Sequence, residues 1–545
     1  MSDDAKSIIE AQEKLAERRQ NWSNWWQQIA LRVMPSEAQF TVLNEEGQRR
    51  QERVFSGKPV TANEKFAAIM DDLLTPRSQI WHTLAPEDDD LADSQESKVY
   101  LERLNTLVFT QRYRPAANFA SQKSQGYLQV GAFGNSALFI DEEVGKGLRY
   151  HNIPLREVFW STNHQGQIDV LYRRFFLDAR QAAQRAKVSN WQLPTRITDA
   201  ATKDPFKKFE FIHCVRPNDD RVYGRIDAKG MPYASYYLAL EDKFMCSSGG
   251  FTSWPYGIGR YMLAPNEVFA RSPAMSCWGA ILTINEEKKT ILRAGQKEVD
   301  PPLLLAEDGI LEAMNMRPGA LNHGALSAQG EELVKPLKLG ANIPLGMELL
   351  DLEGKDIEDA FSTAIYQVLL DHPDMTATQV LEIAQQKGML LAPMMGRQQS
   401  EDLGPLILRE IDLLSRDSRF NWIATDMPDE LRERGGAFKI EYRSSLARML
   451  RAQDGVAIMR TFEAIPAAMQ IDPDAALVFD VIAGLRELSE INGVPAKLLR
   501  DDKTIQAMQA QKQQQQALQS AVAAAPAVSQ AALNAAKADQ ARAAV

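Results

Sequence analysis

Cysteine and histidine are scarce in this chain of 545 residues. The three cysteines, Cys214, Cys246 and Cys277, form no CxxC pair, which argues against a zinc ribbon or a disulfide framework and favours a reducing environment. The six histidines are spaced too widely to share a metal ion. His213 precedes Cys214 on an expected strand, where neighbouring side chains point to opposite faces. The sequence therefore predicts no metal site and no cofactor.

Long uncharged apolar runs and catalytic signatures are also missing. No window of about 18 residues could span a membrane, and the charged N-terminal segment has no apolar signal core, so assembly in the cytosol is expected. No P-loop, HExxH, GxSxG or EF-hand loop occurs. Gly257 and Gly259 begin a GxG pattern, but Met262 stands at the third glycine position. We therefore predict no catalytic residues and expect the protein not to be an enzyme.

The charge balance excludes a uniformly basic nucleic-acid coat. Lys and Arg total 62 against 72 Asp and Glu, which gives a formal net charge of −10. DNA can still pass over such a protein, because the distribution of charge matters more than its sum. No expected helix carries the dense Arg/Lys face of a groove reader. The small basic groups are best interpreted as solvated surface: Arg49, Arg50 and Arg53; Arg173 and Arg174; Lys335 and Lys338.

The first expected helix covers residues 4–33. Ile8, Leu15, Trp22 and Ile29 recur every seven residues, as the apolar face of an amphipathic helix requires. Tryptophans beside this stripe, Trp25 and Trp26 among them, pack against neighbouring elements or form a partner-binding face.

A mixed α+β region follows. A helix is expected over 61–75, where Thr61 and Glu64 match a capping box, and two helical patterns lie between about 95 and 140. Residues 148–272 are rich in strand-like segments separated by turns.

Two expected helical rods enclose a small insert. Ser272 followed by proline starts the first rod at 273, and about 27 residues to 299 give a length of roughly 40 Å. The insert, 300–350, is rich in glycine and short apolar stretches. The second rod, 356–371, carries Ile357, Phe361, Ile365 and Val368 on one face. The pattern predicts two helices side by side with the insert at their far end.

The C-terminal part is mainly helical. A loop at 371–376 is followed by a helical stretch to about 418, a strand-like AFKIEYR within 419–443, and helices over 444–500. Ala and Gln supply 26 of the 43 residues from 503 to 545, so this tail is either a polar helical extension or disordered.

The order of these segments resembles the head-to-tail connector (portal) proteins of short-tailed double-stranded-DNA bacteriophages. The resemblance covers nearly the whole chain. It is carried by KFAAIMDDLLTPRSQIWHTLAP, SQGYLQVGAFGNSALFIDEE, the Tyr-Gly-x-Gly-Arg turn of YGIGRYMLAPNEVFARSPAMSCWGAILTINEEKKTIL, DMTATQVLEIAQQKGMLLAP, GPLILREIDLL and the Gln-rich C-terminus. No single motif is specific, and the order and spacing carry the identification.

The resemblance implies an α+β, mainly helical fold in four parts, assembled as a ring of normally twelve subunits. The implied parts are a wing (1–272), a stem (273–299 and 356–371), a clip (300–355), a tunnel loop with the returning wing segment (372–443), a crown (444–502) and a tail (503–545). The implied location is the virion, at one capsid vertex and the head–tail junction. Double-stranded DNA would pass through the channel during packaging and ejection without sequence-specific contacts.

The resemblance also implies partners and docking residues. The capsid or scaffold protein, the large terminase and tail adaptor proteins are the expected partners, with no membrane. The tunnel loop would contain His372, Asp374 and Thr376. The clip residues expected to dock terminase or tail proteins are Arg317, His323, Lys335 and Lys338.

Mixed charge on the rods agrees with a conduit, because a wall that fixed many phosphates would hold the DNA. Two alternatives stay open. One is an oligomeric scaffold or adaptor without a channel. The other is a metal-dependent nuclease with carboxylates from 88–90 and from Glu142 and Glu143.

Overall fold

The computed structural model describes residues 2–43, 54–88, 94–143, 146–225, 228–305, 315–337, 343–363, 394–433, 436–442, 455–466 and 480–491, with short gaps at 318, 323, 324 and 328 and isolated residues elsewhere. The chain divides into two units. Unit 1 comprises Met1–His82, Thr106–Ala424 and Tyr442–Ala447, and unit 2 comprises Thr83–Asn105, Thr425–Glu441 and Arg448–Val545.

A five-stranded antiparallel sheet organises the N-terminal part of unit 1. Its order is β4-β5-β6-β7-β8. The strands are β4 (Val158–Thr162), β5 (Ile168–Asp178), β6 (Lys208–Pro217), β7 (Tyr233–Ala239) and β8 (Phe244–Phe251). Tyr172 pairs with Cys214 in the register of β5 and β6.

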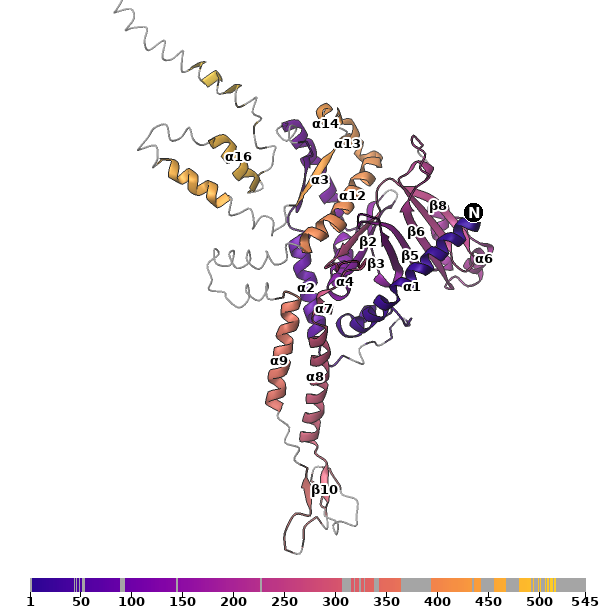
Figure 1. Ribbon diagram of the computed structural model, residues 1–545, viewed down its shortest axis with the longest axis vertical. Coiled ribbons are helices and arrows are strands. Elements are labelled where there is room, and N and C mark those ends of the chain that lie inside the picture. Colours follow the sequence, from indigo (N-terminus) through magenta and orange to yellow (C-terminus); the bar gives the residue numbers. More distant parts are fainter. Residues whose placement is uncertain are drawn as a thin grey trace, which may run out of the picture. The chain divides into compact units, whose positions relative to one another are not determined.

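Helix α1 (Ser2–Val33) covers one face of this sheet (Figure 1). Its Ile8 and Ile9 are buried in a cluster with Tyr172 and Ile212, as the seven-residue apolar stripe predicts. Burial of such apolar area is the main stabilising contribution at this face. Trp26 is fully buried and forms ring contacts with Phe40 and Phe269, so it packs in the core.

Helices α5 (Ala179–Ser189) and α6 (Thr195–Lys203) cover the opposite face. Phe175, Phe209 and Phe211 point into a buried cluster with Trp191 and Ile197. His213 and Cys214 point to opposite faces of β6, as predicted. His213 contacts Tyr256 and Ser235, whereas Cys214 lies in the α1 cluster.

A three-stranded sheet, β3-β2-β9, joins this layer to several helices. The strands are β2 (Asn135–Glu143), β3 (Gly147–Ile153) and β9 (Tyr256–Arg260). The helices around them are α2 (Lys58–Leu74), α4 (Phe119–Phe133), a π-helical turn (Gln399–Leu403) and α12 (Gly404–Arg416). Asn135 pairs with Arg260 at the start of β2.

Two long helices, α8 (Trp278–Val299) and α9 (Ile343–Ala360), lie side by side within unit 1 (Figure 1). We call them the helical pair. Short helix α7 (Pro273–Ser276) precedes α8, and strands β10 (Leu303–Leu305) and β11 (Val334–Pro336) form an antiparallel hairpin at the far end. The order of helix, insert and helix agrees with the sequence prediction, whereas the bounds of the second helix differ from it.

Unit 2 contains residues from distant parts of the chain. Strands β1 (His82–Pro86) and β12 (Phe438–Tyr442) pair in a two-stranded sheet. Unit 2 also contains α14 (Asp429–Glu433), a helix at 455–466 and α16 (Val481–Ile491). Helices α3 (Gln95–Arg112) and α13 (Trp422–Thr425) are divided between units 1 and 2. Gly484 lies against the Phe462 ring, where a Cβ would come within 2.5 Å of Cζ.

Four sequence predictions need correction. The second helix begins at Ile343 and not at 356, because Pro344 and Gly346 are tolerated in its first turn. The first rod is interrupted at Cys277 between α7 and α8. Helix α2 begins at Lys58, so the expected capping box lies inside the helix, where Thr61 Oγ1 donates to the carbonyl of Gly57.

The fourth correction concerns the Tyr-Gly-x-Gly-Arg segment. It was expected to be a turn but forms β9, whose five residues are all buried. The mixed α/β fold, the strand within AFKIEYR and both helices between 95 and 140 are confirmed. None of the helices described could cross a lipid bilayer.

Candidate functional site

The helical pair is tied into unit 1 at its upper end. Ser272 caps α7: its hydroxyl accepts from the Met275 amide at 3.1 Å and donates to the Ala132 carbonyl at 2.9 Å. Ile357 on α9 and Phe361, directly after the helix, are fully buried, and the Phe361 ring lies 6.1 Å from that of Phe66 on α2. Both helices therefore begin or end in the core, and their remaining turns project from it.

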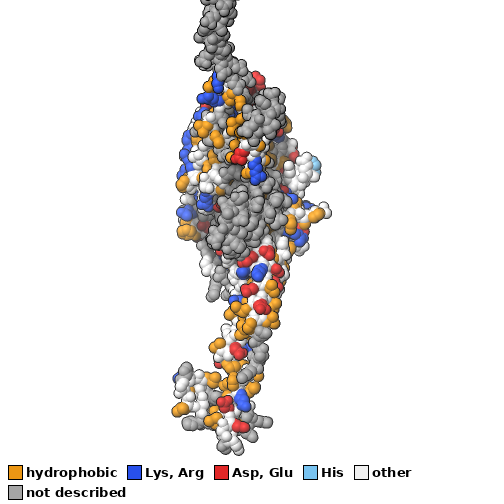
Figure 2. Space-filling view, turned by 90° about the vertical axis from the view of Figure 1, so that its left-hand side faces the viewer, with side chains coloured by type: hydrophobic (Ala, Val, Ile, Leu, Met, Phe, Trp, Pro, Cys, Tyr) orange, Lys and Arg blue, Asp and Glu red, His pale blue; other side chains and the backbone are white. Residues whose placement is uncertain are grey.

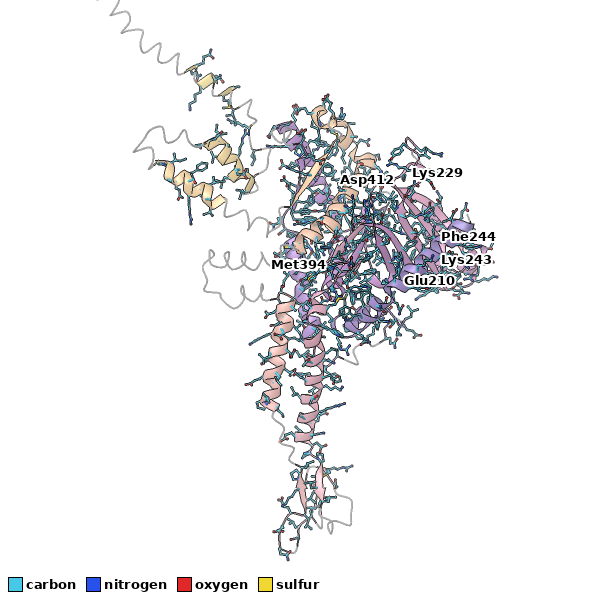
Figure 3. The ribbon with its side chains drawn as sticks, in the orientation of Figure 1. Glu210, Lys229, Lys243, Phe244, Met394 and Asp412 are labelled. Atoms are coloured by element: carbon cyan, nitrogen blue, oxygen red, sulfur yellow. The ribbon has the colours of Figure 1, made fainter. Side chains whose placement is uncertain are left out.

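Contact between α8 and α9 is close along the pair. A Cβ on Gly346 would lie 3.0 Å from Cδ1 of Ile291, so glycine permits this approach. Side chains project from both sides of the pair (Figure 3). Two local ion pairs stabilise this region: Lys289 Nζ with Glu286 at 2.9 Å, and Lys58 Nζ with Glu358 at 2.9 Å.

The hairpin β10–β11 at the far end is small and solvent-facing. Leu304 and Leu305 are more than half exposed, and Lys335 pairs with Leu304 in the register. Arg317 lies in the exposed connection between the strands. The other predicted docking and loop residues lie outside the described residues: His323, Lys338, His372, Asp374 and Thr376.

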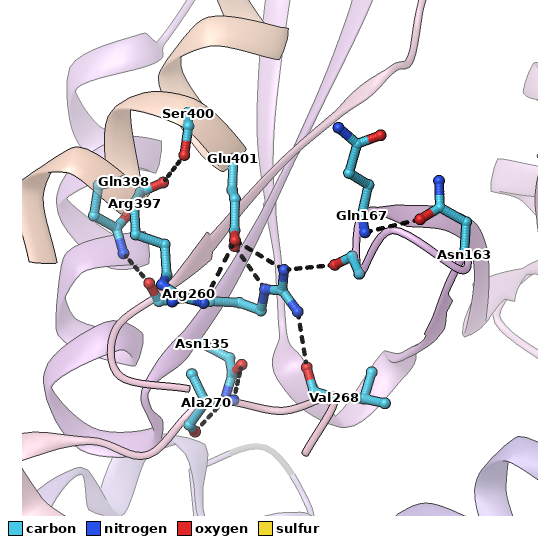
Figure 4. Close-up of polar contacts among 11 residues, drawn as sticks. Asn135, Asn163, Gln167, Arg260, Val268, Ala270, Arg397, Gln398, Ser400 and Glu401 are labelled. Atoms are coloured by element: carbon cyan, nitrogen blue, oxygen red, sulfur yellow. Dashed lines mark hydrogen bonds and ion pairs between the residues drawn. The ribbon is translucent and has the colours of Figure 1, made fainter. Parts of the chain in front are cut away.

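An ion pair between a buried arginine and a half-buried glutamate joins β9 to the π-helical turn. Arg260 is 3% exposed and binds Glu401 through two contacts, Nε to Oε2 at 2.6 Å and Nη2 to Oε1 at 2.8 Å (Figure 4). Its guanidinium also donates to the carbonyls of Gly166 and Val268, and Gln398 donates to the Arg260 carbonyl at 3.1 Å. A bidentate pair of this kind fixes geometry as well as charge.

Two glycines of β9 allow the π-helical turn to lie directly on the strand. A Cβ at Gly257 would come within 2.5 Å of Asp402 Oδ1, and one at Gly259 within 2.6 Å of Gln398 Oε1. Asp402 also forms a buried ion pair with Lys123 of α4. Glycines at alternate positions of one strand are the sequence signal for this close approach.

Helix α12 adds further buried polar contacts. Arg112 binds Glu410 with Nε to Oε1 at 2.9 Å and Nη2 to Oε2 at 2.5 Å, and neither side chain is exposed. Tyr150 donates to Glu410 Oε1 at 2.5 Å. Burial, and then the Glu410 carboxylate, raise the pKa of Tyr150 well above its ordinary value, so it stays a donor. Asp412 (Figure 3) accepts from Ser253 at 2.6 Å.

Residues 398–412 thus bring several carboxylates into cationic sites of the N-terminal part. Sequence analysis missed all of these pairs, because their partners are separated by 141 to 298 residues. Such pairs specify where the returning segment docks, since a misplaced carboxylate would be buried without a partner.

The carboxylates considered for a nuclease are not gathered into a site in the described part of the chain. There, no group of three or more His, Cys, Asp or Glu is arranged to hold a metal ion. Glu143 forms a surface ion pair with Lys146 at 2.6 Å, and residues 89 and 90 lie outside the described residues.

Comparison with known proteins gives the family. A family model for the bacteriophage head to tail connecting protein matches residues 5–499. The chain belongs to this family. It is 24% identical over 533 residues to the portal protein of Salmonella phage epsilon15, covering 95% of this chain and 93% of that protein. It is 22% identical over 504 residues to the probable portal protein of Bordetella phage BPP-1, covering 91% and 88%.

This connector-family chain also aligns with one solved chain of a native gene transfer agent virion. The alignment covers 77% of this chain and 90% of the solved chain. Its identity is 11% and its TM-score 0.33, a likeness that carries no argument here. The family match confirms the resemblance identified from the sequence. Connector proteins are structural components of the virion, located at the capsid vertex, and this chain is one of them.

Proposed function

We propose that copies of this connector protein, twelve by the family resemblance, form a ring at one capsid vertex through which double-stranded DNA enters and later leaves the head. The observation that carries the proposal is the helical pair, which is rooted in the core of unit 1 and ends in a small exposed hairpin. In a ring, the helical pairs of successive copies would surround a central passage. The curated portal relatives support this proposal.

The charge pattern of the helical pair suits passage of a polyanion. Helix α8 carries Glu286, Glu287, Lys288 and Lys289 in succession, and the last turns of α9 are acidic. Each fixed phosphate–cation contact releases counterions and strengthens DNA binding. Mixed and acidic walls would therefore let DNA move rather than hold it.

In this proposal the hairpin β10–β11 and its connection would form the clip, where the terminase docks during packaging and tail adaptor proteins replace it. Exposed leucines Leu304 and Leu305 and the exposed cations Arg317 and Lys335 suit a contact surface. His323 and Lys338 belong to the same proposed surface. The tunnel loop with His372, Asp374 and Thr376 would constrict the channel.

The proposal is tested by imaging the purified full chain and measuring its native mass. Closed rings of about twelve copies with a central hole are expected. A stable monomer or dimer under assembly conditions would refute it. A compact oligomer without a hole would favour the scaffold alternative. DNA cleavage that requires added Mg²⁺ and is lost in Asp89→Ala would favour the nuclease alternative.

A further inference from the structure

Two hollows of unlike charge flank the helical pair. The first has a volume of about 600 Å³ and lies between α8 and α9, where Leu282, Glu286, Glu287 and Leu349 line it. We call it the acidic groove. The second has a volume of about 440 Å³, and cationic side chains dominate it. We call it the basic pocket, and its lining includes Phe55, Lys58, Lys65 and Lys288.

The hollows open on different faces of α8, and they share no lining residue. Successive residues of a helix are 100° apart, so Glu286, Glu287 and Thr290 share one side and Lys288 points away from it. Asn285 marks the second face: its Oδ1 accepts from the amide of Phe55 at 2.8 Å. The residues of α9 are divided between the two hollows in the same way: Leu349 lines the acidic groove and Glu358 lines the basic pocket.

The acidic groove is incomplete within one chain. Oε2 of Glu287 is buried, yet it has no hydrogen-bond partner among the described residues. Burial, and then the nearby Glu353 carboxylate, raise the pKa of Glu287. Leucines along the same side of α9 are exposed, with 51% of Leu345, 43% of Leu349 and 59% of Leu352 accessible. A carboxylate oxygen that is shielded from solvent without a partner among the described residues, beside exposed leucines, suits a cationic and apolar partner.

The basic pocket has complementary properties. Lys58 is paired with Glu358, but no described residue forms an ion pair with Lys65 or Lys288. The pocket therefore carries excess positive charge. The same side of the helical pair exposes Leu292 and Met347, which are 48% and 53% accessible.

One charged residue of each hollow lies at the same level along α8. Glu287 and Lys288 are consecutive, so they differ by about 1.5 Å along the axis of α8. A rotation about an axis along the pair would bring the groove of one copy against the pocket of the next without a shift along the axis. A head-to-tail contact of this kind closes into a ring instead of growing into a filament.

We propose that the acidic groove of one copy receives the basic pocket face of the next, with Lys288 pairing with Glu287 across the contact. The leucines of α9 would be covered by Leu292 and Met347 of the neighbouring copy. Figure 2, which views the molecule from the α9 side, shows acidic and hydrophobic side chains along the surface of the pair. This inference rests on the proposed ring and names the contact that closes it.

Charge reversal tests the pairing in the full chain. Lys288→Glu and Glu287→Lys should each raise the concentration needed for half-maximal assembly about tenfold, measured by sedimentation or native mass. The double variant should recover most of that loss. Its rescue cannot come from within one chain, because neighbouring residues of a helix do not face each other. Circular dichroism and thermal unfolding check that each variant is folded.

The matched control is Lys355→Glu, which makes the same charge change at an exposed position of α9 that lines neither hollow. It should assemble like the original chain. If the original chain forms no ring, the proposed function fails together with the contact. If rings form and both single reversals assemble as well as the control, only the contact fails.

Two other outcomes also overturn the contact. One is a double variant that assembles no better than the worse single variant. The other is a Lys288→Glu variant that assembles normally but binds a short DNA duplex less tightly, which would assign the basic pocket to phosphate.

Discussion

The buried pair of Arg112 and Glu410 gives the sharpest stability prediction. Both side chains are fully buried, and they are joined by two hydrogen bonds. Glu410→Leu leaves the Arg112 guanidinium without its counter-charge. Arg112→Met likewise leaves the Glu410 carboxylate without its counter-charge. Each single change should lower the free energy of unfolding by about 3–5 kcal/mol, because an uncompensated charge then stays in the core.

The double change should cost much less than the sum of the two single changes. Removing both charges takes one polar contact from the Tyr150 hydroxyl and one from the His82 ring, and each such loss costs about 1–3 kcal/mol. We therefore expect a coupling energy of about 2 kcal/mol or more from the double-mutant cycle. A cost equal to the sum would refute the buried-charge reasoning.

The assay is urea unfolding at pH 7 followed by tryptophan fluorescence. Trp81, one of nine tryptophans that contribute to the signal, lies beside the site, with the Arg112 guanidinium 4.6 Å from its ring centroid. The control is Arg103→Met, which breaks an ion pair with Asp426 whose partners are 56% and 50% exposed. That variant should lose less than about 1 kcal/mol. Equal losses for Arg112→Met and Arg103→Met would contradict the prediction.

Three further predictions concern single residues. Burial raises the pKa of Glu37 from 4.5 to about 7, so the unfolded chain releases this proton first and stability falls as pH rises from 4.5 to 7. Glu37→Gln should therefore raise the free energy of unfolding at pH 8 by roughly 1–2 kcal/mol, with little effect at pH 4. Equal effects at both pH values would be inconsistent with this prediction. Gly257→Ala should lower the free energy of unfolding in urea by about 1–3 kcal/mol, because the new Cβ would clash with Asp402. The control Gly279→Ala, whose Cβ would meet nothing within 4 Å, should be neutral or stabilising. A similar result for both variants would rule out the close approach. Ser272→Ala should lower stability by about 1–2 kcal/mol through loss of the α7 cap and the bond to Ala132, and an unchanged melting temperature would show that this cap is unimportant.

Helix α1 and the helical pair show how far local pattern reaches. The repeat of Ile8, Leu15, Trp22 and Ile29 predicts one buried face, and α1 runs from Ser2 to Val33 with Ile8 in the core. Ser272 and Pro273 predict a helix start, and the structure has the cap. Both signals are carried by residues within a few turns of each other, so the sequence displays them directly.

The start of α9 shows where local pattern misleads. The frequent glycines of this part of the sequence, Gly346 among them, predict an insert of loops and short strands. In the structure, Gly346 and Gly354 allow close contact with Ile291 and Lys58. Packing between elements thus outweighs the low helix propensity of glycine at these two positions.

The sequence alone determined the class of the protein: the mixed α/β content, the order of rod, insert and rod, and the connector family. These follow from periodicity, capping residues and segment order, which are local or linear properties. The tertiary structure alone decided which charges meet. The pairs of Arg112 with Glu410 and of Lys123 with Asp402 depend on contacts between distant segments. So does Glu287, whose Oε2 has no partner among the described residues. No linear pattern encodes the distance between two side chains.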